Sequence, residues 1–114
     1  MPNKIKQYIF LRSDLANFST GALLAQVSHA SVGAIHLFYG HEITKQYLDD
    51  LSNMTTIIYS IEEKDIQSVC SELEKENIQY YQWNENHEII TCIATRPVLD
   101  TKRFGDLKRK YKLF

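Results

Sequence analysis

A glutamine and a histidine three positions apart are the first candidates for chemistry in this sequence. Gln26 and His29 have the spacing of side chains on one face of a helix. A neutral imidazole at His29 could act as a general base or donate a hydrogen bond to a phosphate. The same spacing also fits an exposed or hydrogen-bonded histidine on a helix surface. The pair therefore predicts either an acid–base site or an ordinary polar helix face.

Two carboxylates lie where α/β proteins commonly bind ligands, beyond the carboxyl ends of predicted strands. Asp14 follows the first predicted strand, and Glu85 lies in the turn after Trp83. Asp14 could orient a ligand or a neighbouring histidine, or it could cap its loop by accepting hydrogen bonds from backbone amides. Glu85 could be an active-site carboxylate, although turns are commonly acidic. Both interpretations stay open for each residue.

Positive charge is concentrated at the C-terminal end of the chain. Residues 42–88 carry a net charge of −8, whereas residues 89–114 carry +5. The basic end could hold an RNA phosphate backbone without sequence preference, or it could be a solvated terminal helix. No aromatic RNA-binding signature accompanies it. The basic residues concerned are Arg96, Lys102, Arg103, Lys108, Arg109, Lys110 and Lys112.

Several kinds of site are missing from the sequence. A chain of 114 residues fits one domain, residues 1–114. It has no Gly-rich phosphate loop, GxSxG, HExxH or CxxC motif, which argues against the familiar nucleotide- and zinc-dependent hydrolases. Cys70 and Cys92 are expected to be buried and unreactive. We therefore expect no metal, no cofactor and no membrane span, and a cytoplasmic location.

The segments that must position these residues alternate between strand and helix patterns. A strand is predicted over residues 5–12, and a helix from a cap at Ser19 or Thr20 to about Phe38, with Gly40 as its left-handed stop. One face of this helix is apolar, and the opposite, polar face carries Gln26, His29, Gly33 and His36.

The remaining segments complete a layered α/β pattern. A short helix is predicted over residues 43–51 and a strand over 55–60, followed by a capping box from Ser60 to Glu63 and a third helix that ends at Asn77. Strands over 78–83 and 89–95 are close enough for a hairpin, and a basic amphipathic segment follows Pro97. This order predicts helices on both faces of a mixed four-stranded sheet, a three-layer α/β/α sandwich.

Two segments together resemble a known family. Residues 8–15, which end in Arg-Ser-Asp-Leu, and residues 21–31, which contain Ala-Gln-Val-Ser-His-Ala, are similar to the type II peptidyl-tRNA hydrolases of archaea and eukaryotes. The likeness is greatest to the divergent peptidyl-tRNA hydrolase domain-containing subgroup. It implies an α/β/α sandwich, often dimeric, that cleaves the ester between a peptide and tRNA. By this resemblance Asp14, Gln26 and His29 occupy matched positions of the active cleft.

The sequence departs from the family pattern at the start of the first helix. Typical members carry lysines where this chain has Thr20 and Ala22, and their Asp-Ala-Gly-Arg-Thr segment is replaced by a shorter turn in which Glu85 is an approximate substitute. The resemblance implies catalysis by His29 with Asp14 and Gln26 in orienting roles. Alternatives are a weak or inactive RNA- or protein-binding module and an esterase for another activated ester. The residues expected to bind tRNA are Thr20, Arg96, Lys102, Arg103, Lys108 and Arg109.

Overall fold

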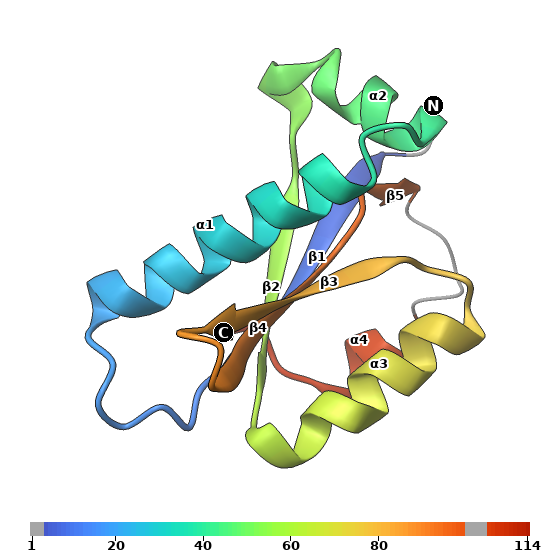
Figure 1. Ribbon diagram of the computed structural model, residues 1–114. Helices are drawn as coiled ribbons and strands as arrows, with labels where there is room; N and C mark the ends of the chain where they lie inside the picture. Colours follow the sequence, from blue (N-terminus) through green and yellow to red (C-terminus); the bar gives the residue numbers. More distant parts are fainter. Residues whose placement is uncertain (1–3, 100–104) are drawn as a thin grey trace.

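A mixed sheet organises the chain in the computed structural model, which describes residues 4–99 and 105–114 (Figure 1). Its strands follow the order β2-β1-β4-β3, and a short β5 pairs with the beginning of β1. β1 is parallel to β2 and antiparallel to β4, which is antiparallel to β3. β1, β2 and β3 therefore all end at one edge of the sheet. The strands are β1 (Ile5–Arg12), β2 (Thr56–Ile61), β3 (Tyr80–Glu85), β4 (Ile89–Thr95) and β5 (Val98–Leu99).

Helices cover both faces of this sheet. Figure 1 shows α1 on one face and α3 with α4 on the other, as the predicted three-layer sandwich requires. The predicted mixed four-stranded sheet is confirmed, with β5 as an additional strand. No helix in the described ranges is long and apolar enough to cross a membrane. The helices are α1 (Thr20–Leu37), α2 (Glu42–Leu48), α3 (Ile66–Lys75) and α4 (Gly105–Lys110), with short 3-10 helices at Leu51–Asn53 and Glu63–Asp65.

Alternation along β1 builds a core on each side of the sheet. Ile9 and Leu11 pack with Ala30 of α1, whereas Phe10 faces the opposite layer and packs with Leu107 of α4. A fully buried side chain of this size stabilises the fold by roughly 1.5–3 kcal/mol. The central position of β1 and the two-sided burial of its residues explain why its sequence is an almost continuous apolar run.

Local signals located several element boundaries correctly. Ser19 caps α1, because its Oγ accepts a hydrogen bond from the Ala22 N–H at 3.1 Å. Asn77 follows α3 with a φ of 58°, the left-handed conformation expected at a helix stop. β3 and β4 form the predicted hairpin through Asn86 and His87, which both have positive φ.

Two local predictions are wrong. Gly40 has no positive φ and is not a left-handed stop, although α1 ends at Leu37, close to the predicted end at about Phe38. Ser60 lies inside β2, and its N–H bonds to the Lys112 carbonyl at 2.8 Å. The capping box lies further on, where the Glu62 N–H donates to the Asp65 carboxylate at 2.9 Å. The basic amphipathic segment predicted after Pro97 contains α4 and begins with the additional strand β5, which pairs with β1.

Candidate active site

Helix α1 crosses the sheet with its supposed polar face partly turned inward. Gln26 is only 3% exposed, and Gly33 lies against the ring of Tyr81. A Cβ at position 33 would lie 2.3 Å from Tyr81 Cε2, so only glycine permits this approach. The prediction that Gln26 and Gly33 lie opposite the core is therefore wrong, because this part of the helix packs on β3 and β4. His29 and His36 remain exposed.

A buried hydrogen bond fixes the side chain of Gln26. The Thr91 hydroxyl donates to Gln26 Oε1 at 2.7 Å. Trp83 pairs with Cys92 and Asn84 with Ile90, which leaves Thr91 as an extra residue in β4. Such a bulge changes the direction of a side chain, and here it accompanies a Thr91 hydroxyl turned toward α1. Within the described residues, Gln26 Nε2 has no hydrogen-bond partner, so it remains a donor for another molecule.

The imidazole of His29 lies against an aromatic ring. Its centroid is 4.5 Å from that of Trp83, with an angle of 33° between the ring planes. The two rings border an open groove of about 390 Å³ between α1 and β3, which is lined by His29, Val32, Gly33, His36, Tyr81 and Trp83. Gln26 lies one helical turn away from His29, beside this groove. The arrangement places an exposed imidazole and a hydrogen-bonded amide one helical turn apart.

Asp14 is held by Arg12. Arg12 Nε donates to Asp14 Oδ1 at 2.9 Å and its Nη2 to Oδ2 at 3.2 Å, and Oδ2 also accepts the Glu63 N–H at 3.1 Å. These hydrogen bonds, foremost those from Arg12, lower the pKa of Asp14 below its ordinary value. Arg12 Nη1 donates in addition to the Ile90 carbonyl at 3.2 Å, next to the bulge. Asp14 thus makes the contacts of a loop-capping carboxylate.

The other two candidates of this region lie at the ends of elements. Glu85 is the last residue of β3, opposite Ile89, and its side chain is half-buried. Thr20 is the exposed first residue of α1. The edge where β1, β2 and β3 end therefore gathers Asp14, Thr20 and Glu85, and it lies next to the Gln26 and His29 contacts on β3 and β4.

The basic candidates lie elsewhere. Arg96 is 9% exposed at the far end of β4, and its Nη1 donates to the Pro97 carbonyl at 2.9 Å. Lys108 and Arg109 belong to α4, on the sheet face opposite α1. Lys108 Nζ lies 5.6 Å from the centroid of the Tyr8 ring, and Arg109 pairs with Asp106 at 2.7 Å. Lys102 and Arg103 fall outside the described residues. The structure does not bring Arg96, Lys108 or Arg109 beside His29.

The cysteines and potential metal ligands suggest no second chemistry. Cys70 and Cys92 are buried, as predicted, and burial raises the pKa of the Cys92 thiol to about 12. Within residues 4–99 and 105–114, no three His, Cys, Asp or Glu side chains are grouped to hold a metal ion.

Two contributors were not selected from the sequence as site residues. Trp83 and Thr91 contact His29 and Gln26, respectively. The alternation of Tyr81 and Trp83 along β3 was an available signal for an aromatic face on one side of the strand. The bulge that directs Thr91 has no comparable local signal, because it depends on the pairing of two strands.

Known proteins are similar to this chain over nearly its whole length. The profile of the family described as "Peptidyl-tRNA hydrolase PTH2" matches residues 5–114. Proteins of Mus musculus and Homo sapiens, both named "Putative peptidyl-tRNA hydrolase PTRHD1", are each 34% identical to the chain over 119 residues. These alignments cover 99% of the chain and 84% of each relative. The similarity thus includes the whole region of Asp14, Gln26, His29 and Glu85.

Proposed function

The chain belongs to the peptidyl-tRNA hydrolase PTH2 family, and on this basis we propose that it hydrolyses the ester between tRNA and a peptide or N-blocked amino acid. One observation carries the proposal: Gln26 and His29 lie one turn apart on α1, and each is held by a partner from the β3–β4 hairpin. A general base and a hydrogen-bond donor held in this way are the groups that ester hydrolysis requires.

In the proposed reaction, water attacks the ester carbonyl carbon while His29 removes its proton. The negative charge that develops on the carbonyl oxygen is stabilised by Gln26 Nε2, whose orientation is set by the bond from Thr91 to Oε1. The bond between the carbonyl carbon and the ribose oxygen then breaks, and the protonated imidazole returns the proton to that oxygen. A fixed donor to such an oxyanion typically accounts for about 100-fold or more in rate.

The two carboxylates have different parts in this proposal. Asp14 is a positioning residue, since it acts through Arg12, which also binds the Ile90 carbonyl beside the bulge. Glu85 is half-buried, and among the described residues its carboxylate has no hydrogen-bond or ion-pair partner. It is therefore the carboxylate available to orient water or the imidazole.

In this proposal, cationic side chains bind the phosphates of the tRNA backbone. Thr20 lies at the α1 N-terminus, near the proposed chemistry, and Lys108 and Arg109 lie on the opposite face, so an RNA that contacts both regions must pass around the sheet. Each phosphate contact made by a cation steepens the loss of affinity with salt. Arg96 is buried and is not part of this surface.

Release of peptide from purified peptidyl-tRNA tests the proposal. His29→Ala should lower the hydrolysis rate by at least about 100-fold, in the range typical of general acid–base catalysis. His87→Asn is the matched control, because it removes another imidazole and asparagine tolerates the positive φ of the turn. Equal activity of His29→Ala and the unmodified protein would contradict the assigned role.

A binding module of the same fold is the second candidate. It is favoured by Thr20 and Ala22, which stand where typical family members carry lysines, and by the engagement of Asp14 with Arg12. Saturable tRNA binding without any ester cleavage, measured at two salt concentrations, would select this alternative over the hydrolase.

A further inference from the structure

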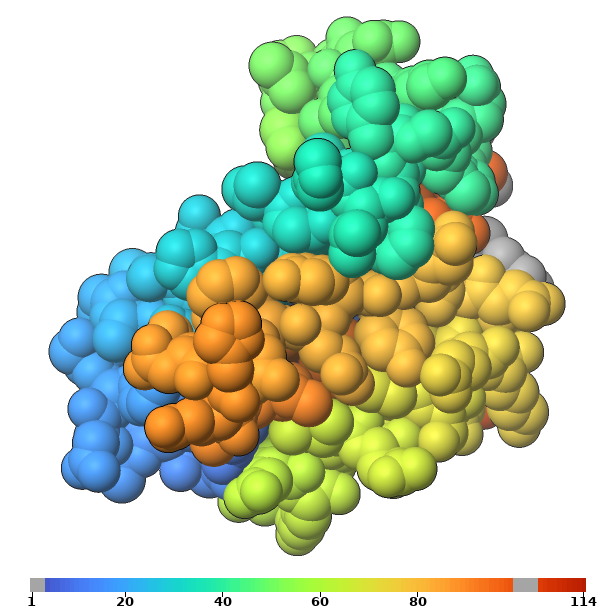
Figure 2. Space-filling view, viewed as in Figure 1, coloured from blue at the N-terminus to red at the C-terminus, as the bar shows by residue number. Residues whose placement is uncertain are grey.

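The groove between α1 and β3 has aromatic walls, of which the proposed hydrolysis uses only Trp83, the ring that contacts His29. Tyr81 and Trp83 alternate along β3 and both face α1, where Tyr81 lies on Gly33 and Trp83 on His29. In Figure 2 the side chains of α1 and β3 border each other along the front of the molecule. We infer that this groove binds the unpaired terminal nucleobase of tRNA by stacking; the inference rests on the proposed function.

The shape and composition of the groove suit a single base. Its volume is about 390 Å³, and its lining includes an indole, a phenol and two imidazoles. Proteins bind unpaired nucleotides by stacking their bases on such rings, and this interaction tolerates any base because every base has a π-face. The covered Trp83 Nε1 has no hydrogen-bond partner among residues 4–99 and 105–114, so this indole provides its ring and no donor to a base edge.

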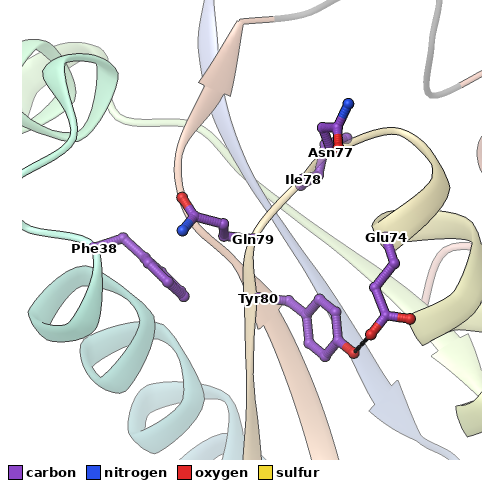
Figure 3. A pocket seen from close by; sticks show the side chains of 6 residues that line it. All are labelled: Phe38, Glu74, Asn77, Ile78, Gln79 and Tyr80. Carbon is purple, nitrogen blue, oxygen red and sulfur yellow. Dashed lines mark hydrogen bonds between the residues drawn. The ribbon is translucent and has the colours of Figure 1, made fainter.

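Charge separates this groove from the other hollows beside β3. None of the described residues that line it is acidic. The groove along α3, of about 480 Å³, contains Glu63 and Glu74. Figure 3 shows Glu74 again in a neighbouring pocket, where its carboxylate accepts a hydrogen bond from the Tyr80 hydroxyl at 2.9 Å. A nucleotide phosphate is repelled by those carboxylates, whereas the groove beside His29 has no such repulsion from its described lining.

The position of the groove connects base binding to the reaction. The terminal base and the ester are attached to the same ribose. A base stacked along Tyr81 and Trp83 therefore places the ester close to His29, which belongs to the wall of the groove. Such positioning raises the effective concentration of the reacting groups. We expect the aromatic wall to determine substrate affinity and the His29–Gln26 pair to determine the chemical step.

Trp83 reports on this groove directly, because it is the only tryptophan in the chain. Titration with AMP, and with the trinucleotide CCA that matches a tRNA 3′ end, should quench its fluorescence in a saturable way. Ribose 5-phosphate, which lacks the base, and N-acetyl-leucine methyl ester, which represents the peptide side, should leave it unchanged. Absence of quenching by AMP and CCA, or saturable quenching by the leucine ester, would overturn the inference.

Two variants and two controls test the same point without tryptophan fluorescence. Binding of CCA that ends in 2-aminopurine, followed by the fluorescence of that base, should weaken roughly tenfold or more in Tyr81→Leu and Trp83→Leu. Tyr81→Phe retains the ring and should bind normally, and Tyr39→Leu removes an aromatic ring that is exposed outside the groove. Equal binding by all four folded variants, verified by circular dichroism, would contradict stacking.

The outcomes distinguish this inference from the proposed hydrolysis. Quenching by AMP together with no ester cleavage would retain the base site and reject the hydrolase. Ester cleavage with KM unchanged in Tyr81→Leu would retain the hydrolase and reject the base site. If both proposals hold, Tyr81→Leu raises KM and leaves kcat largely unchanged.

Discussion

Two buried glutamines lie at the interface of α1 and the sheet, and their surroundings differ. Gln7 of β1 uses both ends of its amide: Nε2 donates to the carbonyls of Thr95 and Ser31 at 3.0 and 3.3 Å, and Oε1 accepts from Ser31 Oγ at 2.6 Å. Gln26 of α1 uses only Oε1, which accepts from Thr91 at 2.7 Å. No described residue accepts a hydrogen bond from Gln26 Nε2.

Within one interface, the Gln7 amide is fully used by the fold, whereas the Gln26 amide keeps a donor for the proposed chemistry. Thr95 and Thr91 lie near opposite ends of β4, so the helix–sheet contact is closed by a saturated network at one end and keeps an unused donor at the other. Among the described residues, Gln26 Nε2 is not one of the fully covered side-chain atoms that lack a partner, so another molecule can reach it. Gln7 therefore has a structural role, whereas Gln26 keeps a donor that we propose binds the substrate oxygen.

Removal of the unused donor should have the largest effect on catalysis. Gln26→Leu should lower kcat for peptidyl-tRNA hydrolysis by about 100-fold or more, because the oxyanion loses a fixed donor. Its free energy of unfolding should fall by only about 1–2 kcal/mol, the cost of leaving the Thr91 hydroxyl unpaired. Single-turnover kinetics and urea unfolding measure the two quantities. A large loss of stability with a normal kcat in Gln26→Leu would show that Gln26, like Gln7, has a structural role.

Removal of the saturated amide should have the opposite result. Gln7→Leu leaves Ser31 and a Thr95 carbonyl without their side-chain partner, so the free energy of unfolding should fall by about 2–3 kcal/mol. The folded fraction should keep its kcat. Urea unfolding measures the stability, and hydrolysis kinetics at urea concentrations below the unfolding transition measure kcat. A catalytic defect equal to that of Gln26→Leu would show that the two glutamines do not differ in role.

Loosening the unused donor, without removing it, should have an intermediate effect. Thr91→Val keeps the shape of the bulge residue but deletes the hydroxyl that orients Gln26. We expect kcat to fall roughly tenfold, which is less than in Gln26→Leu, since the donor remains present but is no longer fixed. Thr91→Ser restores the hydroxyl and should recover most of the rate. Failure of serine to do so would argue against orientation through this hydrogen bond.

The smallest expected effect is on the acid dependence of stability, which should differ between Asp14→Asn and Gln7→Leu. Hydrogen bonds from Arg12 lower the pKa of Asp14, so the folded state favours the carboxylate more strongly than the unfolded state does. This contribution to stability is present above the ordinary value of 3.8 and is lost as the pH falls through the lower folded-state pKa. Urea midpoints should therefore decrease below about pH 3.8 less steeply in Asp14→Asn than in Gln7→Leu, whose deleted network has no ionisable group. Urea midpoints that decrease equally steeply with acid in the two variants would contradict this prediction.

Much of the fold was predictable because its signals are local. β1, α1 and the β3–β4 hairpin follow from apolar patterning and turn spacing, and Ser19 and Asn77 mark helix ends through their own backbone preferences. The predicted helix stop at Gly40 and the predicted capping box at Ser60 failed, because packing fixed the end of α1 and the extent of β2. The family was recognisable for the same local reason, since its two characteristic segments are contiguous in the chain.

Sequence patterns alone indicate that Gln26 and His29 share one side of a helix, that the chain belongs to its family, and that positive charge collects at one end. Four contacts became visible only in the folded chain: Thr91 with Gln26, Trp83 with His29, Arg12 with Asp14, and the α4 cations with the far side of the sheet. The physical reason is distance along the chain: helical spacing and charge are properties of neighbouring residues, whereas strand order and a bulge bring together residues that no local preference connects.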